Sequence, residues 1–494
     1  MADLRPTILL TGASGYVGGK LLRGLLDSGH DVRCLIRNPS AFTEPDALGV
    51  ECIQGDALDP ATLPPAFDDI DTAYYLIHSM GVGSDFEQLD RDAAQNFAEA
   101  AKAAGVSRII YLGALAEESD SLSPHMRSRL EVGEILRSSN VPTLEFQASI
   151  IIGAGSLSFE IMRALVERIP IMTPPRWVRT LCQPISIHDV VAYLLDALDY
   201  EDTDTRIFQI GGAQQVSYQD LMREYQRRRG LKRLVIPLPF VSARISSLWL
   251  ALITPLHFRV GRRLIESIGR EPTVVTDLSA LDTFGVRPCG IADSIIRALV
   301  DEDAHFASTS WSDELNGKTV RQPYGGLRYG PRFVDSHIFE ASCRPSSAFK
   351  PIQRIGGDAG WYYGSWLWKL RGFIDRMLGG PGLSRGRRDS GRLEHGDTVD
   401  FWCVEVFHPG RRLRFAAEMK LPGRAWLDFE ARESDAGALI RATAIFDPKG
   451  LYGLAYWFAV YPLHGWLFRG MLKRIAEHAE TECELELTED EAKS

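Results

Sequence analysis

No two cysteines in the 494-residue sequence are spaced as Cys-x-x-Cys; the seven thiols lie at positions 34, 52, 182, 289, 343, 403 and 483. Structural zinc sites need closely spaced ligands, and disulfide frameworks need an even, clustered set of cysteines. The scattered, odd-numbered set therefore predicts reduced thiols in a cytoplasmic protein without a metal site. A signal peptide is also missing, because Arg5 and Pro6 lead directly into an apolar run.

The sequence has no excess of positive charge either. Lys and Arg number 55 against 65 Asp and Glu, which gives a net charge of −10. Because nucleic-acid binding depends on clustered cations that neutralise phosphates, this balance argues against a nucleic-acid partner.

An uninterrupted run of about 20 apolar residues, the length that spans a bilayer, is missing too. The two most apolar stretches are residues 240–258 and 451–468, which are interrupted by residues such as Arg244 and Pro462. We predict both to be buried or to lie at interfaces. Peripheral contact with a membrane is the alternative.

The most informative stretch is Thr-Gly-Ala-Ser-Gly-Tyr-Val-Gly at residues 11–18. It lies between a β-branched apolar run and an amphipathic segment, the strand–turn–helix setting of a dinucleotide-binding loop. There one glycine permits the tight turn, the second lets the backbone approach the pyrophosphate, and the third lets the helix pack closely on the sheet. The predicted cofactor-binding residues of this turn are Gly12, Ser14, Gly15, Tyr16, Val17 and Gly18.

Strand-like and helix-like segments alternate through the first half of the chain. The predicted strands are residues 31–36, 50–54, 72–77, 108–112 and 143–152, with a strongly periodic helix at residues 86–104. This alternation predicts an α/β fold with a doubly wound parallel sheet, a Rossmann fold. Ligands bind beyond the carboxyl ends of such strands, so the residues that follow each strand are the candidates for the site.

The spacing Gly-x-x-Gly-x-x-Gly after Thr11 resembles the short-chain dehydrogenase/reductase superfamily, in particular its extended and atypical branches. The resemblance runs from the N-terminus to about Val300. It implies an NAD(P)-binding domain at residues 1–300, with a substrate lobe mostly in residues 151–300. Within that lobe Asp189 is predicted to cap a helix rather than to act in catalysis.

The choice of cofactor depends on the residue after the second predicted strand. An NAD-selective site has Asp or Glu about 20 residues beyond the glycines, where it binds the ribose 2′-hydroxyl. Arg37 stands there instead, and a guanidinium suits a 2′-phosphate. The sequence therefore favours NADP; NAD is the alternative if Arg37 is only a solvated residue at a strand end.

The resemblance implies further cofactor contacts after the third and fourth strands. Asp56 and Ala57 match the segment whose aspartate contacts the adenine ring, although Asp56 would serve equally well as a turn residue. Ile77 and His78 match the edge that runs along the ribose and the nicotinamide. His78 is thus a candidate site residue, and a structural histidine is the alternative.

The catalytic residues of the resembled family are not matched. The family has Ser after the fifth strand and Tyr-x-x-x-Lys on the next helix, whereas this sequence has Gly113, Ala114 and then His125 and Arg129. The last two share a helix face because they are four residues apart. Since histidine exchanges protons near neutrality unaided, we predict that His125 is the catalytic acid or base. Arg129 would then hold a ribose, a phosphate or a substrate anion; a charged pair on the surface is the alternative.

The composition changes after residue 300. Residues 301–330 read as a linker, and seven of the ten tryptophans follow between Trp361 and Trp466. An antiparallel meander and a closing helix are predicted at residues 399–406, 413–420, 425–432, 439–446 and 464–479. This order of elements resembles the START-like (SRPBCC) helix-grip fold, an α+β domain at residues 331–480, which implies a cavity for a lipophilic ligand.

Two charged segments complete the second domain. Residues 379–396 carry Arg385, Arg387 and Arg388 between glycines and would either clasp an anion or form a solvated loop. The chain ends in an acidic tail at residues 481–494. The acidic stretch at residues 480–491 is predicted to be disordered.

These features predict an NADP-dependent oxidoreductase that acts on a small lipophilic carbonyl or quinone-like compound, which the second domain would bind or deliver. The alternative is an NADP(H)-binding redox sensor or scaffold that catalyses nothing. Loss of the Tyr-x-x-x-Lys pair favours the sensor, and the pocket-like second domain favours the enzyme. The arrangement of the two domains resembles a family of two-domain bacterial proteins.

Overall fold

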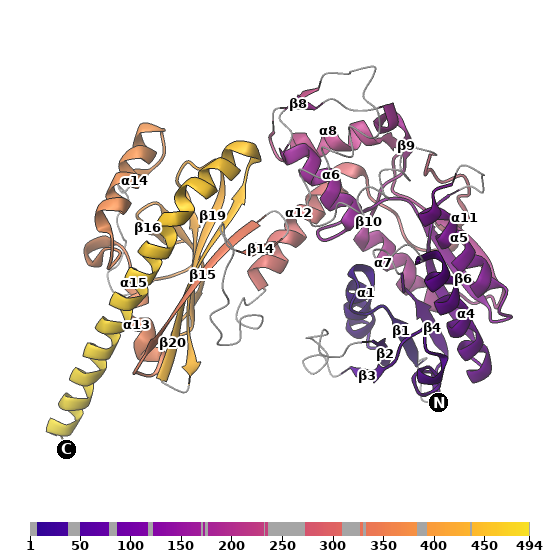
Figure 1. Cartoon of the computed structure of the whole chain (residues 1–494), viewed down its shortest axis with the longest axis horizontal. Coiled ribbons are helices and arrows are strands. Elements are labelled where there is room, and N and C mark those ends of the chain that lie inside the picture. The colour runs from indigo at the N-terminus through magenta and orange to yellow at the C-terminus, as the bar shows by residue number, and fades with distance from the viewer. Residues whose placement is uncertain are drawn as a thin grey trace. The chain divides into compact units, whose positions relative to one another are not determined.

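The computed structural model divides the chain into two compact units, Met1–Thr309 and Ser310–Ser494. Each unit has its own sheet and its own hydrophobic core (Figure 1). The structure describes residues 7–37, 50–78, 86–116, 122–168, 171–172, 176–231, 233–235, 272–308, 327–329, 332–382, 393–434 and 437–493.

A seven-stranded parallel sheet forms the centre of the first unit. In sheet order its strands are β11 (Arg206–Ile210), β6 (Thr143–Ala148), β5 (Arg108–Ala114), β4 (Thr72–Tyr75), β1 (Ile8–Thr11), β2 (Val32–Ile36) and β3 (Glu51–Gln54). The order reverses at β1, which pairs in parallel with both β2 and β4. The switch point of the sheet therefore lies where β1 ends, and the predicted Rossmann fold is confirmed.

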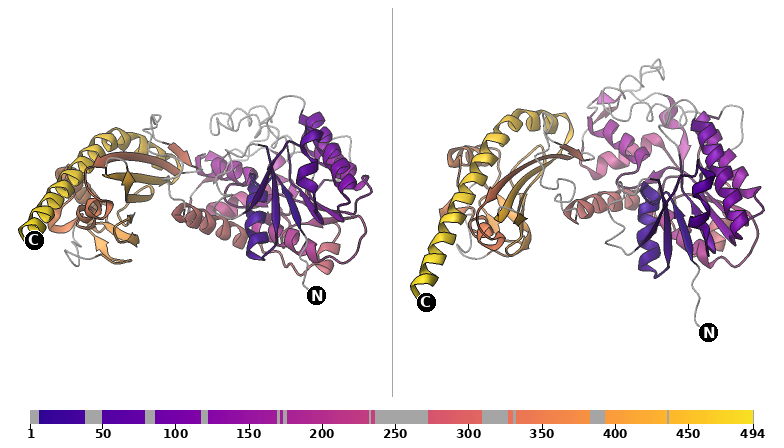
Figure 2. Two further views of the ribbon diagram at one scale, coloured as in Figure 1. Left: turned by 90° about the horizontal axis from the view of Figure 1, so that it is seen from below. Right: turned by 60° about the horizontal axis from the view of Figure 1, so that its bottom comes forward.

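Helices cover both faces of this sheet (Figures 1 and 2). One core lies between the sheet and α1 (Tyr16–Asp27), α7 (Ile187–Asp196) and α11 (Ser279–Thr283). The other lies between the sheet and α3 (Pro64–Phe67), α4 (Phe86–Ala104) and α5 (Pro124–Arg137). Along β1, Ile8 and Leu10 belong to the first core and Leu9 to the second, as the two-residue period of a strand requires. Burial on both faces explains why this strand is an almost continuous apolar run.

A smaller lobe follows the sheet in sequence. Its helices α6 (Leu157–Arg168), α8 (Tyr218–Arg228) and α12 (Ile291–Ser308) pack around Phe159, Val166 and Ile295. Short strands and 3-10 turns complete the first unit: η2 (Pro60–Thr62), β7 (Ile151–Ile152), β8 (Ile171–Met172), η3 (Arg176–Arg179), β9 (Leu181–Cys182), β10 (Ile185–Ser186), η4 (Ala197–Asp199), β12 (Val216–Ser217) and β13 (Leu234–Val235). The strand predicted at residues 143–152 is thus divided, because β6 joins the large sheet while β7 pairs with β10.

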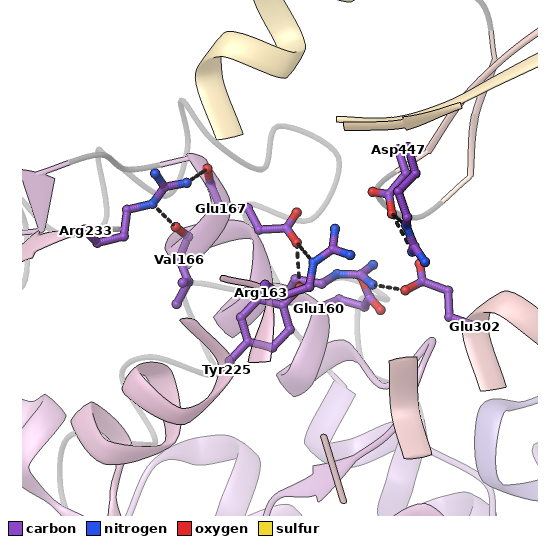
Figure 3. A network of polar contacts seen from close by, with 10 residues as sticks. Glu160, Arg163, Val166, Glu167, Tyr225, Arg233, Glu302 and Asp447 are labelled. Carbon is purple, nitrogen blue, oxygen red and sulfur yellow. Dashed lines mark hydrogen bonds and ion pairs between the residues drawn. The ribbon is translucent and has the colours of Figure 1, made fainter. Parts of the chain in front are cut away.

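A buried network of charges holds the helices of this lobe together (Figure 3). The guanidinium of Arg163, almost fully buried, pairs with Glu160 one turn earlier on α6 and with Glu302 of α12, 2.9 Å away. Glu167, one turn further along α6, accepts a hydrogen bond of 2.6 Å from the hydroxyl of Tyr225 on α8. Burial raises the pKa of Glu160, and its pairing with Arg163 opposes that shift. Because these charges are removed from water, each depends on its partner.

We expect Arg163→Met to lower the free energy of unfolding by about 3–5 kcal/mol, because the buried carboxylates lose their cation. Arg223→Met is the matched control: Arg223 lies on α8, is half exposed and forms a surface ion pair with Asp220. It should change the free energy of unfolding by less than about 0.5 kcal/mol. Urea denaturation followed by circular dichroism would compare the two variants. Equal effects would show that the network does not hold the lobe together.

An antiparallel sheet of seven strands forms the second unit. In sheet order the strands are β14 (Leu327–Tyr329), β15 (Arg332–Ala341), β20 (Gly437–Pro448), β19 (Gly423–Ser434), β18 (Arg412–Ala417), β17 (Trp402–His408) and β16 (Thr398–Val399). Strands β17 to β20 pair in the order of the sequence, so the predicted meander is confirmed. The first long strand, β15, closes on the last one, β20.

Three helices accompany this sheet: α13 (Pro345–Gln353), α14 (Ser365–Met377) and α15 (Gly450–Lys493), with the 3-10 turn η6 (Gly357–Ala359). Helix α15 packs on β15 and β20 and against α13 (Figures 1 and 2). Aromatic side chains fill the core; the rings of Trp361 and Trp368 stack with centroids 4.3 Å apart. On the opposite face of the sheet, Arg414 and Asp428 form a buried ion pair of 2.8 Å.

A buried carboxylate ties α15 to the sheet. Asp335 of β15 lies 3.1 Å from Nε2 of His337 on the same strand and 3.4 Å from Nδ1 of His464 on α15. Burial by itself would raise the pKa of Asp335. The two imidazoles outweigh this effect and lower the pKa to about 2. A polar contact between the Asp335 carboxylate and His464 therefore accompanies the apolar packing of the helix.

The prediction of a disordered acidic segment at residues 480–491 is wrong, because α15 continues to Lys493. Two acidic side chains of the segment have partners in the domain. Glu480 accepts a hydrogen bond of 2.7 Å from the amide of Ser342, and Glu482 pairs with Arg354 at 2.5 Å. Composition alone does not reveal such partners, which fix the helix beyond its apolar part.

The prediction that Asp189 caps a helix is also wrong. The N-cap of α7 is Ser186, whose hydroxyl accepts a hydrogen bond from the amide of His188. Asp189 lies in the first turn, and its carboxylate accepts a hydrogen bond of 2.9 Å from the amide of Cys289. It therefore fastens the segment before α12 to α7.

Several predicted features fall outside the described residues: the apolar stretch at residues 240–258, most of the linker after Ser308, and Arg385, Arg387 and Arg388. Within the part that the structure describes, no helix is long and apolar enough to cross a membrane, and no cluster of His, Cys, Asp or Glu could hold a metal ion. All seven cysteines are free thiols.

Candidate active site

The glycine turn connects β1 to α1 at the switch point of the sheet. Gly12 has a φ of +70°, which other residues rarely adopt, and a Cβ there would lie 2.6 Å from the carbonyl oxygen of Leu76. A Cβ on Gly18 would overlap the carbonyl oxygen of Gly12, so α1 packs directly on the turn. Gly15 differs from both. It is exposed, and a Cβ there would lie 3.1 Å from the same oxygen, so a side chain would chiefly obstruct an incoming ligand.

The N-terminus of α1 is open to an anion. Its N-cap is Gly15, no side chain caps it, and the neighbouring Ser14 is exposed. The first amides of a helix lack intrahelical partners, and the helix dipole favours negative charge there. The backbone at Gly15 is free of a side chain and lies at the uncapped N-terminus of α1. This arrangement fits the pyrophosphate of a dinucleotide.

Contacts on either side hold the turn in place. The Thr11 hydroxyl donates to the carbonyl of Tyr74 at 2.8 Å and accepts from the amide of Leu76 at 3.1 Å, so it joins the ends of β1 and β4. Tyr16 lies against Gly153, where a Cβ would overlap its hydroxyl. The glycine turn is therefore fixed between the end of β4 and the loop that begins the lobe.

The predicted adenine-side residues follow β2 and β3, on the same edge of the sheet. Arg37 is exposed. The carboxylate of Asp56 accepts a hydrogen bond of 3.0 Å from the amide of Leu58, as a turn residue does, and the carbonyl of Ala57 accepts one of 2.9 Å from Asn96. These residues therefore follow strands that end on the same edge of the sheet as β1, and Asp56 is engaged in its own loop.

A histidine and a buried aspartate meet beyond the end of β4. Nδ1 of His78 lies 3.0 Å from the carboxylate of Asp90 on α4, which also accepts a hydrogen bond of 2.9 Å from the Ser128 hydroxyl of α5. Burial lowers the pKa of His78 and the Asp90 contact opposes that shift. The carboxylate favours the tautomer with the proton on Nδ1, which leaves Nε2 as an acceptor. Among the described residues, Nε2 has no hydrogen-bond partner.

The two predicted histidines come together. The rings of His78 and His125 lie 5.0 Å apart between centroids. Arg129, on the same face of α5, hydrogen-bonds to the carbonyls of Ile77 and Leu112, and its guanidinium lies 5.0 Å from the ring centroid of Tyr111. It therefore clamps the ends of β4 and β5 and holds the segment that carries His78.

Gly113, where the sequence comparison expected a serine after the strand, lies within β5 beside a buried glutamate. A Cβ on Gly113 would lie 2.9 Å from the Glu145 carboxylate, which is fully buried in β6 and pairs with Arg137 of α5. Gly133 of α5 also makes room for this carboxylate. The space that a serine side chain at Gly113 would need is occupied.

Asp90 and Ser128 are absent from the predicted set. A signal for Asp90 exists in the sequence, because it lies on the apolar stripe of α4 formed by Phe86, Ala93, Ala94 and Phe97. A charged residue within a buried stripe requires a buried partner, which marks it as a candidate for a site. Ser128 carries no comparable signal.

Comparison with known proteins bears on this geometry. A family model described as NAD(P)H-binding matches residues 12–141. This range covers the glycine turn, both histidines and the clamp of Arg129. The first unit therefore has a Rossmann fold, and its residues 12–141 are similar to the NAD(P)H-binding family. A second family model, described as a protein of unknown function (DUF2867), matches residues 328–471.

Two curated relatives resemble this Rossmann domain. The photosystem II assembly factor Ycf39 of Cyanophora paradoxa is 26% identical over 266 residues, which are 53% of this chain and 79% of the relative. The ceramide reductase of Caulobacter vibrioides is 29% identical over 175 residues, 34% of this chain and 54% of the relative. One of these relatives is named as an assembly factor and the other as a reductase, and both are similar in sequence to this Rossmann domain.

Among solved structures, the triphenylmethane reductase of Citrobacter sp. has a TM-score of 0.50 with 19% sequence identity. The match covers 60% of this chain and 99% of that chain. At this identity the similarity concerns the fold of the Rossmann domain.

Gly15 and Gly18 are expected to respond differently to substitution by alanine. Gly15→Ala should leave the free energy of unfolding within about 1 kcal/mol of the wild type, since its backbone is extended. It should weaken NADP(H) binding at least about tenfold, because the methyl group occupies the space of the pyrophosphate. Gly18→Ala should destabilise the fold by about 1–3 kcal/mol through overlap with Gly12. Thermal unfolding and calorimetric titration would separate the two; strong nucleotide binding by Gly15→Ala would contradict the assignment.

Proposed function

We propose that this protein is an NADP(H)-dependent oxidoreductase that reduces a lipophilic carbonyl or quinone-like compound. The observation that carries the proposal is the pair of histidine rings 5.0 Å apart at the edge of the sheet that also holds the glycine turn. When bound, the reduced nicotinamide supplies a hydride. The protein must then supply a proton to the resulting alkoxide.

The two histidines have different roles in this proposal. Because burial lowers the pKa of His78, its imidazole is neutral near pH 7 and donates its Nδ1 proton to Asp90. His125, partly exposed at the start of α5, is the residue that delivers the proton. The His78 ring, with its acceptor Nε2, lies 5.0 Å between centroids from the ring of the residue that must lose and regain a proton. Arg129 fixes this arrangement through the carbonyls at the ends of β4 and β5.

The proposed substrate class rests on the lobe. A narrow cavity there is lined almost entirely by apolar side chains, among them Ile152, Phe159 and Met162, with Ser158 and Tyr218 as polar members. Ile152, in this lining, belongs to β7. The residues that follow β7 include Gly153 and Gly155, which pack against Tyr16 of the glycine turn. The cavity is about 30 Å³, which is room for little more than a water molecule. The support for a lipophilic compound over a sugar or a nucleotide is therefore the apolar character of this part of the lobe, not the size of the cavity.

We also propose that the second unit is a START-like helix-grip domain that binds or delivers this compound. The support is its topology: a long helix, α15, crosses an antiparallel meander. Most of its tryptophans pack in the core rather than line a cavity, so the support comes from the order of elements alone.

A non-catalytic role is the second candidate. It is favoured by the absence of the family's serine, tyrosine and lysine, and by the similarity to a photosystem II assembly factor. In this reading the domain binds NADP(H) and acts as a redox sensor or scaffold. Activity assays on candidate substrates distinguish the two roles.

Arg37 gives a test of cofactor choice. We expect tighter binding of NADP(H) than of NAD(H), because the guanidinium pairs with the 2′-phosphate. Arg37→Asp should cost about 1.5–3 kcal/mol for the phosphorylated cofactor through loss of that pairing and added repulsion. Calorimetric titration with both cofactors measures the difference, and Arg23→Asp, on an exposed site of α1, controls for net charge. Equal affinities in the wild type would remove Arg37 from cofactor selection.

His125 gives a test of the chemistry. We expect His125→Ala to lower kcat by about 10²–10⁴-fold while the affinity for NADPH changes little. In the wild type the rate of carbonyl reduction should fall as the pH rises, because a proton donor must be protonated to act. Asp90→Asn should alter this pH profile through His78 more than it alters KM.

The measurement is NADPH oxidation with a panel of lipophilic ketones and quinones, and His408→Ala, an exposed histidine of the second unit, is the control. Full activity of His125→Ala on a substrate of the wild type would exclude the residue as the donor. The sensor role predicts NADPH binding without turnover in every protein of the series.

A further inference from the structure

Helix α14, labelled in Figure 1, carries a stripe of solvent-exposed apolar side chains. Trp366, Leu370, Phe373, Ile374 and Met377 are exposed, with 62% of Phe373 and 74% of Met377 accessible to solvent. They recur at i, i+4, i+7, i+8 and i+11, so they form one continuous face of the helix.

The opposite face of α14 is the one that holds it to the domain. Trp368 stacks on Trp361, and the fully buried carboxylate of Asp375 accepts hydrogen bonds of 2.9 Å and 2.6 Å from the amides of Gly382 and Lys420. The orientation of α14 is therefore fixed. Its exposed stripe is a consequence of the fold and not of a loosely attached helix.

The stripe continues onto α15. Trp466 is about half exposed, and its ring lies 4.8 Å from that of Tyr363, just before α14 begins. A Cβ on Gly364, the N-cap of α14, would lie 3.6 Å from the Trp466 ring. The two helices thus form one surface, the α14–α15 patch, defined by the α14 stripe, Leu463 and Trp466.

The charges around this patch are positive in a chain whose net charge is −10. Lys369 and Arg376 are exposed beside the stripe on α14, and Arg469 is exposed one turn beyond Trp466. The only acidic residue of α14 is the buried Asp375, and α15 has no acidic residue before Glu477. On these two helices, cations flank the apolar surface and no exposed carboxylate precedes Glu477, which complements an anionic, apolar partner.

We propose that the α14–α15 patch binds the surface of a membrane that contains anionic phospholipids. Trp and Phe enter the interface between headgroups and acyl chains, while Lys and Arg on the same helix contact the phosphates. A second copy of the chain fits less well. In a two-fold dimer the same patch faces itself, which would bring Lys369, Arg376 and Arg469 of both copies together without a carboxylate.

The test is co-sedimentation of the full chain with vesicles of phosphatidylcholine alone or of phosphatidylcholine and phosphatidylglycerol. We expect binding to the anionic vesicles that weakens with salt, because ions screen the charged part of the attraction. Phe373→Gln with Met377→Gln should lower partitioning at least about tenfold through loss of apolar burial. Lys369→Glu with Arg376→Glu should lower it at least about fivefold for each charge, and only on anionic vesicles.

Leu278→Gln and Arg223→Glu, at exposed sites of the first unit, are the controls and should bind vesicles as the wild type does. Circular dichroism verifies that each variant is folded. Absence of wild-type binding to anionic vesicles, or equal binding by Phe373→Gln with Met377→Gln, would overturn the proposal. A wild-type dimer that these substitutions convert to a monomer, without vesicle binding, would identify the patch as a contact between copies instead.

Discussion

The close approach of α1 to the end of β1 is the constraint on which the first unit depends. A Cβ on Gly18 would overlap the carbonyl of Gly12, so the helix starts directly after the turn. The first amides of α1 therefore lie next to Gly15, its N-cap. The turn in turn touches Leu76 at the end of β4, two residues before His78. The tight contact between Gly18 and Gly12 therefore places a candidate phosphate site and a candidate proton-transfer site on the same edge of the sheet.

Buried charges give this Rossmann domain a chemistry that its glycine turn does not specify. Asp90 holds His78 and receives the Ser128 hydroxyl, and Glu145 fills the space beside Gly113. A buried carboxylate is costly unless it is hydrogen-bonded, so each of these groups fixes its neighbours in one arrangement. The polar network around Asp90 and Glu145 therefore stands where the sequence has neither a serine after Leu112 nor a Tyr-x-x-x-Lys pair.

The second unit distributes its aromatic residues in two ways. Trp361, Trp368 and Trp402 close the core, whereas Trp366 and Trp466 are exposed on one surface. Aromatic content therefore does not indicate a ligand cavity here. The arrangement on α14 separates the two roles, since one face of the helix anchors it and the opposite face remains available.

The sequence alone determined the parallel sheet, the position of the glycine turn and the antiparallel meander, because these follow from local periodicity and from residues that only a few backbone conformations accept. It also identified His78 and His125 as separate candidates. Only the tertiary structure decided that their rings meet, that Asp90 holds one of them, and that Arg129 clamps two strand ends. The same is true of Ser186 as the cap of α7 and of the helical acidic segment. Each of these depends on a partner distant in sequence or on the choice between two adjacent polar residues, and periodicity carries no information about either.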